Sequence, residues 1–490
     1  MKTFKYFILT IAVFSIWACE EMDFIQEEPK SDYALTGVNA DVLESLVLGT
    51  YEPLARSRGR LWESLYSSFI ELQGEYALSV GGGSFAACAT FNFPGILQSE
   101  LAAVWTTFYQ AIGRANFLIE SVEKNSTLAD NVKNKALGEA RFIRALCYYQ
   151  LVRSWGKVPM RLLPVTDANN TAEPLAEIDA IYKQIIADLQ YAESTLPAKV
   201  VSTGAGRATK GAASTMLADV YLTLKDYPSA RTKSLEVMTN KATYGYNLET
   251  SLPTLFSPTA ATNAEEIFAI KFAQVRAQGN FLAAYAHDTR AKEAGLAARG
   301  LARFSAYKKV PLIRDWDARD LRKAWNLYDT IRINNVKIRA NIPLSGDFLF
   351  GKYRDGAAPE ETAAGNDFYL YRYADALLIF AEAENQINGP TAAAYDAINQ
   401  VRRRSYGVSV NMPNTLSDLP QGLTKTDFDD LVFRERGYEF FFEAKRWFDL
   451  KRTGRLAKII AESGIKTLPA NSEYWPIPNV EKANNPAIPR

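Results

Sequence analysis

The chain has one histidine, His287, and three cysteines among its 490 residues. A Ser-His-Asp triad could be built only on that histidine, and no Gly-x-Ser-x-Gly turn accompanies any serine. Zinc sites need several cysteine or histidine ligands at short spacing, and this sequence has no such group. We therefore expect no serine hydrolase, no zinc enzyme and no cofactor. We interpret His287 as an ordinary polar loop residue.

The sequence also lacks an excess of charge of either sign. Lysine and arginine number 56 and aspartate and glutamate 55, so no overall field favours nucleic acid or an anionic surface. Beyond the first residues, no apolar run is long enough to cross a membrane. The two cysteines outside the leader are Cys88 and Cys147, and whether they pair stays open.

The N-terminus has the features of an export signal. Lys2 and Lys5 precede an apolar run from Phe7 to Ala18, which predicts a signal peptide over residues 1–18. The stretch Ile-Trp-Ala-Cys that ends at Cys19 resembles a bacterial lipobox, in which the cysteine is lipidated and becomes the new N-terminus. The alternative is an ordinary exported cysteine beside a cleavage site.

Acidic residues follow that cysteine directly, namely Glu20, Glu21 and Asp23. They resemble the signal that sends some Gram-negative lipoproteins to the outer leaflet. We predict a lipid anchor at Cys19, since several acyl chains on one cysteine hold a protein firmly on a membrane. The lipid-anchored segment is expected to span residues 19–40.

Helical spacing of apolar residues dominates from about Asp41 onward and predicts a mainly α fold. The segments Ala212–Arg231 and Ala374–Arg404 resemble tetratricopeptide helix pairs in their small residues, aromatics and turns. Irregular spacing between the pairs argues against a regular solenoid. The predicted helices are Asp41–Tyr51, Leu101–Val122, Lys133–Trp155, Ala176–Leu196, Thr209–Leu224, Pro228–Thr239, Asp367–Ile387 and Thr391–Arg404.

Three long irregular regions separate these helices: Gly74–Phe93, Tyr244–Glu266 and Gln278–Phe368. Loops of that length are uncommon inside a compact protein and are usually functional. We therefore expect the function to lie in these regions.

Two chemical motifs have simpler explanations. Gly204–Gly211 imitates a phosphate loop, but Thr209 precedes the lysine, so a helix start explains it better. Glu382 and Glu384 point to different faces of a predicted helix, whereas Asp375 shares a face with Glu382. Ion pairing with nearby arginine accounts for these carboxylates. A glycosidase needs only two carboxylates, so glycosidase activity stays open as an alternative.

The segment Arg434–Arg452 combines opposite charges at helical spacing with many aromatics. A helix that is apolar on so many sides is enclosed by others, so some of its charges should be buried and paired. We predict a structural role for this helix.

At this point the sequence resembles the SusD/RagB family of nutrient-binding outer-membrane lipoproteins. The matching motifs lie in Trp105–Asn116, Glu139–Pro159, Gly206–Ala213, Asn263–Phe268, Leu370–Ala383, Ala397–Arg404, Arg434–Arg452 and Tyr474–Pro486. The resemblance implies a single domain over residues 41–490, with an N-terminal part of about 41–240 and a C-terminal part of about 241–490. Tetratricopeptide-like pairs would form the scaffold, and a large loop-rich region the ligand face.

The same resemblance implies a function. Family members lie on the cell surface over a TonB-dependent (SusC-like) barrel transporter, bind glycans or in some branches peptides, and are not enzymes. A surface glycosidase and an adhesin built on helix pairs are the alternatives from other classes.

Candidate binding residues come from the chemistry of sugars, whose apolar faces stack on aromatic rings and whose hydroxyls bind polar side chains. The first irregular region offers Tyr76 and Phe85 beside Glu75. The third offers Trp316, Trp325, Tyr328, Arg314 and Asp317 beside Asn326. For each aromatic, ordinary packing is the alternative.

Overall fold

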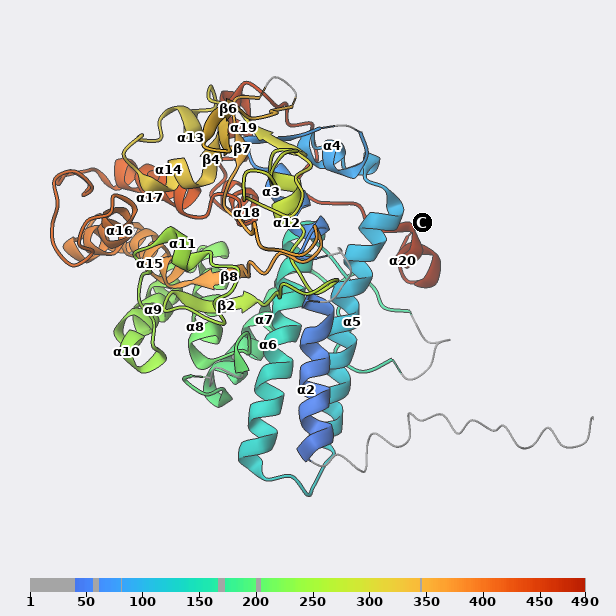
Figure 1. Ribbon diagram of the computed structural model, residues 1–490. Helices are drawn as coiled ribbons and strands as arrows, with labels where there is room; N and C mark the ends of the chain where they lie inside the picture. The colour runs from blue at the N-terminus through green and yellow to red at the C-terminus, as the bar shows by residue number, and fades with distance from the viewer. Residues whose placement is uncertain are drawn as a thin grey trace, which may run out of the picture.

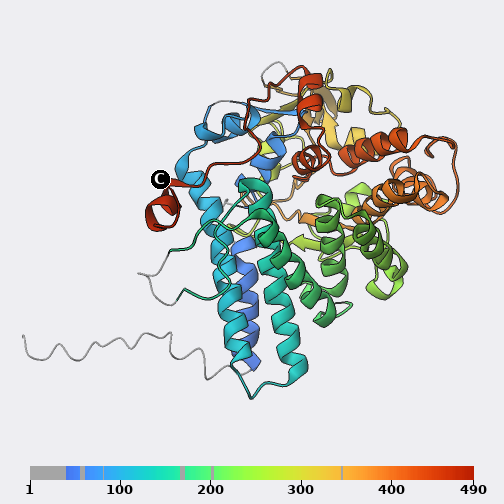
Figure 2. The same cartoon turned by 180° about the vertical axis from the view of Figure 1, so that it is seen from behind.

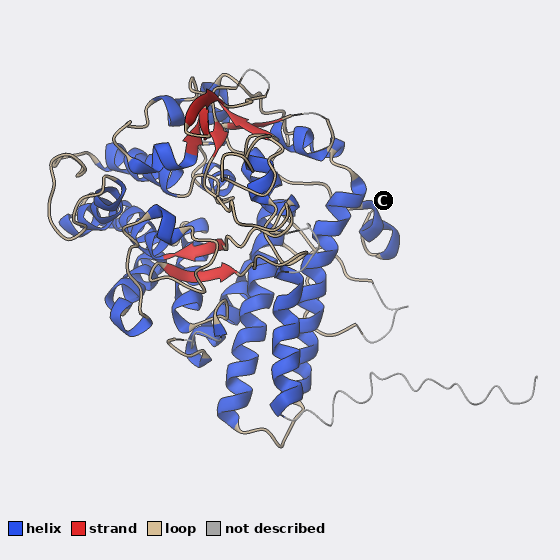
Figure 3. Cartoon of the chain, in the orientation of Figure 1, coloured by secondary structure: helices blue, strands red, loops and turns tan. Residues whose placement is uncertain are grey.

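The computed structural model describes residues 40–55, 61–80, 82–165, 172–199, 204–343 and 346–489. The predicted signal peptide and Cys19 lie outside these ranges. The described chain is mainly helical, as predicted, and its few strands are short (Figure 3). No helix within it combines the length and the apolar character needed to cross a bilayer.

Four long helices of the N-terminal part pack side by side (Figures 1 and 2). They are α2 (Ala40–Ala55), α5 (Gln98–Glu123), α6 (Asp130–Trp155) and α7 (Ile178–Thr195). Helix α6 ends at Gly156, whose φ of 74° lies in the region that glycine adopts without steric cost.

Further helices pack as pairs beside this bundle: α8 (Lys210–Thr223), α9 (Tyr227–Thr239), α15 (Tyr373–Asn388), α16 (Ala392–Ser405) and α17 (Lys425–Glu439). Helix α9 packs against α15, so pairs distant in sequence form one layer. The Thr209 side chain accepts a hydrogen bond of 3.1 Å from the Ala212 amide at the start of α8. The phosphate-loop imitation is therefore a capped helix start.

Shorter helices occupy the remaining chain. They are α3 (Leu65–Leu72), α4 (Ser84–Ala89), the 3₁₀-helix η2 (Phe93–Gly95), α10 (Lys241–Tyr244), α11 (Leu252–Leu255), α12 (Leu282–Ala286), α13 (Pro311–Arg314), α14 (Leu321–Asn326), α18 (Arg446–Arg452), α19 (Leu456–Ser463) and α20 (Asn479–Asn484). Many of them interrupt the regions that the sequence marked as irregular.

The strands form two-stranded antiparallel pairs. These are β1 (Ala77–Ser79) with β3 (Phe304–Ala306), β2 (Glu266–Ile270) with β8 (Phe368–Arg372), β4 (Leu327–Tyr328) with β7 (Leu349–Phe350), and β5 (Thr330–Ile333) with β6 (Val336–Arg339). Three of the four pairs lie entirely within the predicted irregular regions, so short sheets hold these regions in place.

The start of one predicted helix is wrong. The helix expected over Asp367–Ile387 begins at Tyr373, because the five residues before it form strand β8. All five residues of β8 are buried. A strand buried on both faces loses the alternation that distinguishes it from a helix, so the apolar pattern ran on without a visible break.

The segment Arg434–Arg452 is not one helix. Helix α17 ends at Glu439, and α18 starts at Arg446 after a turn. Phe442 and Ala444 in that turn have left-handed backbone, with φ of 61° and 54°. Their amides donate to the Glu71 carboxylate at 3.0 and 2.8 Å, so a distant side chain replaces the helical acceptors.

Most charges of this segment are buried and paired, as predicted, but several of their partners lie outside it. Arg446 binds Glu75 at 2.7 Å and Lys445 binds Asp375 at 2.5 Å, both far away in sequence. Glu439 and Glu443 bind the fully buried Arg372 at 2.8 Å each. The segment therefore joins the two parts of the chain, which the helical spacing did not indicate.

Both cysteines in the described chain are buried thiols without a disulfide. Cys88 lies on α4 and Cys147 on α6. Burial raises the pKa of both thiols. Deprotonation to the reactive thiolate is therefore disfavoured at both positions.

Candidate ligand-binding face

The fold brings the three predicted irregular regions together. Strand β1 of the first region pairs with β3 of the third, and the Val80 amide donates to the Arg303 carbonyl at 2.8 Å. Trp325 of the third region packs with Leu255 and Phe256 of the second. The resulting loop-rich face carries α4, α12, α13 and strands β4, β6 and β7 at the top of Figure 1. We call this surface the loop face.

Phe85 lies at one edge of the loop face. Its ring makes edge-to-face contacts with Phe69, Tyr285 and Phe304, with centroids 5.1 to 5.7 Å apart. Phe85 and Tyr285 are both half-buried, whereas Phe69 and Phe304 belong to the core. An aromatic ring that is held in place by such contacts can stack its free face on a sugar ring. The binding role of Phe85 stays a prediction.

Tyr76 and Trp316 lie in the core, not on the face. Tyr76 is fully buried, stacks on Phe441 at a centroid distance of 4.2 Å and donates its hydroxyl hydrogen bond to Glu71. Trp316 is 2% exposed, and its indole N–H donates to Asp320 at 3.0 Å. Neither ring has a face open to solvent. Their prediction as surface platforms is corrected to core packing.

Trp325 is half-buried and keeps part of its surface exposed. The Arg354 guanidinium lies 4.2 Å from its ring centroid, and one of its nitrogens donates to the Trp325 carbonyl at 2.8 Å. Burial lowers the pKa of Arg354. The cation fixes one side of the indole, so Trp325 is held in place beside the solvent.

Arg314 and Asp317 lie at the surface in local ion pairs. Arg314 binds Asp315 at 2.7 Å, and Asp317 binds Arg319 at 2.7 Å. The Tyr406 hydroxyl also donates to Asp317 at 3.0 Å. The Arg319 hydrogen bonds hold the pKa of Asp317 below its usual range, so this carboxylate stays ionised. Both groups are accessible to a ligand, and their binding role stays a prediction.

Tyr328 is joined to the single histidine. The His287 Nε2 lies 2.7 Å from the Tyr353 carbonyl, which can only accept, so Nε2 carries the proton. Nδ1 then accepts from the Tyr328 hydroxyl at 3.0 Å, and that hydroxyl accepts from the Asp288 amide at 2.9 Å. His287 is completely buried, which corrects its interpretation as an ordinary loop residue, and burial lowers its pKa to about 4.

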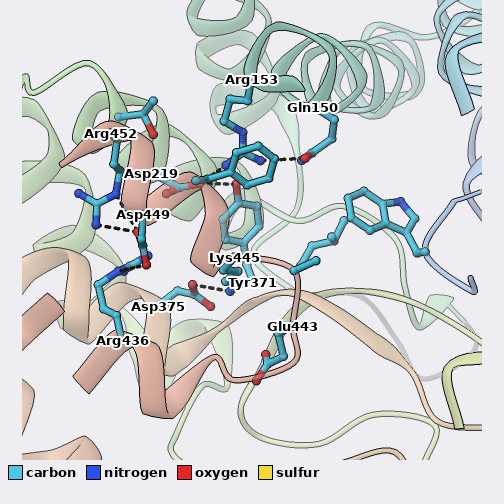
Figure 4. Close-up of a pocket in the computed structure, with 15 residues that line it drawn as sticks. Gln150, Arg153, Asp219, Tyr371, Asp375, Arg436, Glu443, Lys445, Asp449 and Arg452 are labelled. Carbon is cyan, nitrogen blue, oxygen red and sulfur yellow. Dashed lines mark hydrogen bonds and ion pairs between the residues drawn. The ribbon is translucent and has the colours of Figure 1, made fainter. Parts of the chain in front are cut away.

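The carboxylates considered for glycoside hydrolysis are engaged in ion pairs. Figure 4 shows Asp375 bound to Lys445, and Asp449 bound to Arg436 and Arg452. The pocket between them has about 40 Å³ of free space, enough for a few water molecules but not for a sugar. Glu382 pairs with Arg452 and Glu384 with Arg231.

A larger cleft adjoins this pocket, and sequence reasoning missed it. It has about 350 Å³ of free space and lies between the ends of α6, α7 and α8 and the segment from α18 onward. Tyr182, Phe448 and Tyr474 line it. Tyr474 is 41% exposed, and the Lys451 ammonium lies 4.2 Å from its ring centroid. In the sequence, Tyr474 stands out only as the first residue of a family motif.

Comparison with known proteins places the chain in a family. Two family models match: "SusD family" over residues 343–489 and "Starch-binding associating with outer membrane" over residues 88–222. A SusD-like protein, P2, from Formosa agariphila is 29% identical over 99% of this chain and 98% of its own. These matches support assignment of the chain to the SusD/RagB family.

Solved SusD-like structures share its fold. A SusD homologue from Bacteroides thetaiotaomicron is 22% identical, with a TM-score of 0.78 over 94% of this chain and 98% of its own. Surface glycan-binding protein A from the same organism, solved with laminarihexaose, is 18% identical, with a TM-score of 0.76 over 91% and 98%. The two SusD family matches flank residues 223–342, which contain most of the loop-face residues named above.

Proposed function

We propose that the protein binds oligosaccharides or polysaccharides at the outer cell surface and delivers them to a partner SusC-like TonB-dependent transporter. The supporting observation is its near full-length structural likeness to a surface glycan-binding protein solved with laminarihexaose. The partly exposed rings of Phe85 and Trp325 and the surface ion pair of Asp317 with Arg319, all from the irregular regions, add a rationale for sugar binding. Peptides are the alternative ligand class for the same role.

We further infer binding without catalysis. The candidate carboxylates Asp375, Glu382 and Glu384 are held by cations, and the pocket beside Asp375 is too small for a sugar. Burial raises the pKa of Asp375, as a general acid requires, but the small pocket gives this carboxyl no access to a glycosidic oxygen. Release of reducing sugar from any bound glycan, abolished by Asp375→Asn, would favour a glycosidase.

The lipid anchor at Cys19 would hold the protein on the outer membrane. The expected lipoprotein incorporates labelled palmitate, and Cys19→Ala abolishes the label. The transporter partner is tested by co-purification of the full-length lipoprotein with a barrel protein encoded beside it. Absence of the palmitate label contradicts the lipid anchor. Absence of any co-purified barrel protein contradicts the transporter partner.

The direct test is native affinity electrophoresis of the mature chain through gels that contain single polysaccharides. Laminarin, starch, agarose, alginate, polygalacturonate and κ-carrageenan cover neutral and acidic chemistry. Retardation by at least one polysaccharide supports glycan binding. Migration unchanged in all of them, together with binding to a peptide library, would replace glycans by peptides as the ligand.

A further inference from the structure

The β5–β6 hairpin presents three cations on one side. Its register places Arg332 directly opposite Lys337, and Thr330 opposite Arg339. Residues that are opposite each other, or two apart on a strand, share a face of a sheet. Arg332, Lys337 and Arg339 therefore lie together, and all three are exposed. We call this surface the cationic hairpin.

The other side of the hairpin is packed onto the protein. Ile331 is buried in a cluster with Ala302 and Leu349, and Ile333 and Ile338 pack against the same cluster. Polar and apolar residues thus alternate along both strands. The alternation fixes the register, because a slip by one residue would bury the three cations.

The cations of the hairpin have no acidic partner within the described chain. Other cations of the third irregular region do have acidic partners: Arg290 pairs with Asp288 at 3.1 Å, and Lys308 with Asp347 at 3.2 Å. Arg332 donates only a long hydrogen bond of 3.4 Å to the Asn335 carbonyl in the turn. Asp329, just before β5, is exposed and forms no ion pair with the three cations in the described structure.

The charged side is also held rigidly. Asn334 and Asn335 form the two-residue turn with φ of 50° and 64°, the geometry that matches the twist of a hairpin. The Ala340 amide donates to the Asp329 carbonyl at 2.8 Å, and Arg290 donates to the Arg339 carbonyl at 2.7 Å. Like charges directly opposite each other oppose folding, so the arrangement of Arg332 and Lys337 contributes nothing to stability.

We propose that the cationic hairpin binds acidic groups of a glycan, so that the ligand class is a polysaccharide that carries sulfate esters or carboxylates. This inference rests on the proposed function and specifies its substrate. Arginine forks bind sulfate and carboxylate oxygens through two parallel hydrogen bonds, and lysine adds a point charge. Cations two apart on a strand lie about 7 Å from each other, so they contact successive acidic groups of one chain.

The position of the hairpin supports this ligand. Strand β4 leads into β5 with one residue between them, so Tyr328 is two residues from the hairpin and Trp325 five. Tyr328 packs in the same cluster as the underside of the hairpin. The half-buried Trp325 and the three exposed cations therefore occupy one short stretch of the chain, residues 325–339.

The test compares the mature chain with the triple variant Arg332→Gln, Lys337→Gln and Arg339→Gln. A matched control removes three cations at the opposite end of the molecule, where α5 and α6 meet: Lys124→Gln, Lys133→Gln and Lys135→Gln (Figure 1). We expect retardation by alginate, polygalacturonate or κ-carrageenan. The hairpin variant should weaken that binding at least tenfold, and the control less than twofold. Raising NaCl from 50 to 500 mM should weaken the wild type much more than the hairpin variant.

The outcomes separate this inference from the proposed function. Binding to laminarin, starch or agarose alone, or equal binding of acidic glycan by the hairpin variant, overturns the inference and leaves glycan binding intact. If the hairpin variant loses binding to lipopolysaccharide vesicles but to no polysaccharide, the hairpin binds the membrane surface instead, and the inference is again overturned. No binding to any polysaccharide contradicts the proposed function itself. The thermal unfolding temperature of the hairpin variant should be no lower than that of the wild type, because its substitutions relieve repulsion without removing packing.

Discussion

The indole of Trp316 stacks on the phenol ring of Tyr438, with ring centroids 4.6 Å apart and planes inclined by 15°. Trp316 comes from the segment between α13 and α14, and Tyr438 from the last turn of α17. Phe441 also contacts the indole, at a centroid distance of 5.5 Å. This stack joins the loop face to the C-terminal helices, so Trp316 supports the face from below.

Replacing Trp316 by alanine should therefore reduce stability and leave ligand binding unchanged. Removing a buried aromatic side chain typically costs about 3–5 kcal/mol of unfolding free energy. Urea denaturation measures that loss, and affinity electrophoresis below the unfolding transition measures binding. Weakened glycan binding with unchanged stability would show that the indole contacts ligand.

Trp325 should behave in the opposite way. It is half-buried, with Arg354 stacked on it, so Trp325→Ala removes exposed ring surface. We expect about a tenfold loss of glycan affinity, the effect of one good stacking contact of about 1.4 kcal/mol. The matched variant is Tyr474→Ala in the cleft beside α18, which should leave affinity unchanged. If Tyr474→Ala weakens binding and Trp325→Ala does not, the ligand occupies the cleft.

The sequence predicted the scaffold well, because long amphipathic helices carry a strong periodic signal. It failed at β8, where full burial removes alternation, and at Phe442 and Ala444, whose backbone is set by hydrogen bonds to the distant Glu71. Local spacing contains no information on such contacts.

The candidate site was predicted only at the level of regions. The first and third irregular regions share the loop face, and Trp325 of the third packs against the second, but composition does not say which loop aromatic faces inward. Tyr76 and Trp316 are buried, whereas Phe85 and Trp325 keep exposed surface. The Lys337 side chain was not among the candidates, although the alternation of cations and isoleucines around Asn334 and Asn335 was visible in the sequence.

His287 should make stability depend on pH in a defined window. Burial lowers its pKa from 6.5 to about 4, so between these values the unfolded chain binds a proton that the folded chain excludes. The stabilisation is complete above about pH 6.5 and is lost as the pH falls toward 4. The loss between pH 7 and pH 5 is about 2 kcal/mol.

The variant His287→Gln isolates this effect. A glutamine amide can donate to the Tyr353 carbonyl and accept from the Tyr328 hydroxyl, but it does not titrate. Urea denaturation at pH 7 and pH 5 should show a smaller loss for the variant than for the wild type. Because the chain has one histidine, the NMR resonances of its ring report directly on the protonation of His287. A ring that becomes protonated near pH 6.5 in the folded protein would contradict the prediction.

Arg372 is the last case, because it joins strand β8 to the end of helix α17 and the turn that follows it. It is fully buried and binds Glu439 and Glu443 at 2.8 Å each, and Glu265 as well. Arg372→Met leaves buried carboxylates without their main cation, which should cost about 3–5 kcal/mol. Arg319→Met removes an arginine that is 65% exposed from its pair with Asp317, and should cost less than about 1 kcal/mol.

Arg372→Lys adds a second comparison, since it keeps the charge and loses the planar fork. Urea denaturation should rank the losses of stability as Arg372→Met, then Arg372→Lys, then Arg319→Met. The ranking follows from desolvation, because a buried charge without a partner cannot be hydrated, whereas Asp317 at the surface remains hydrated. Equal effects of Arg372→Met and Arg319→Met would mean that water enters the buried network and that Arg372 does not hold Glu265, Glu439 and Glu443 together.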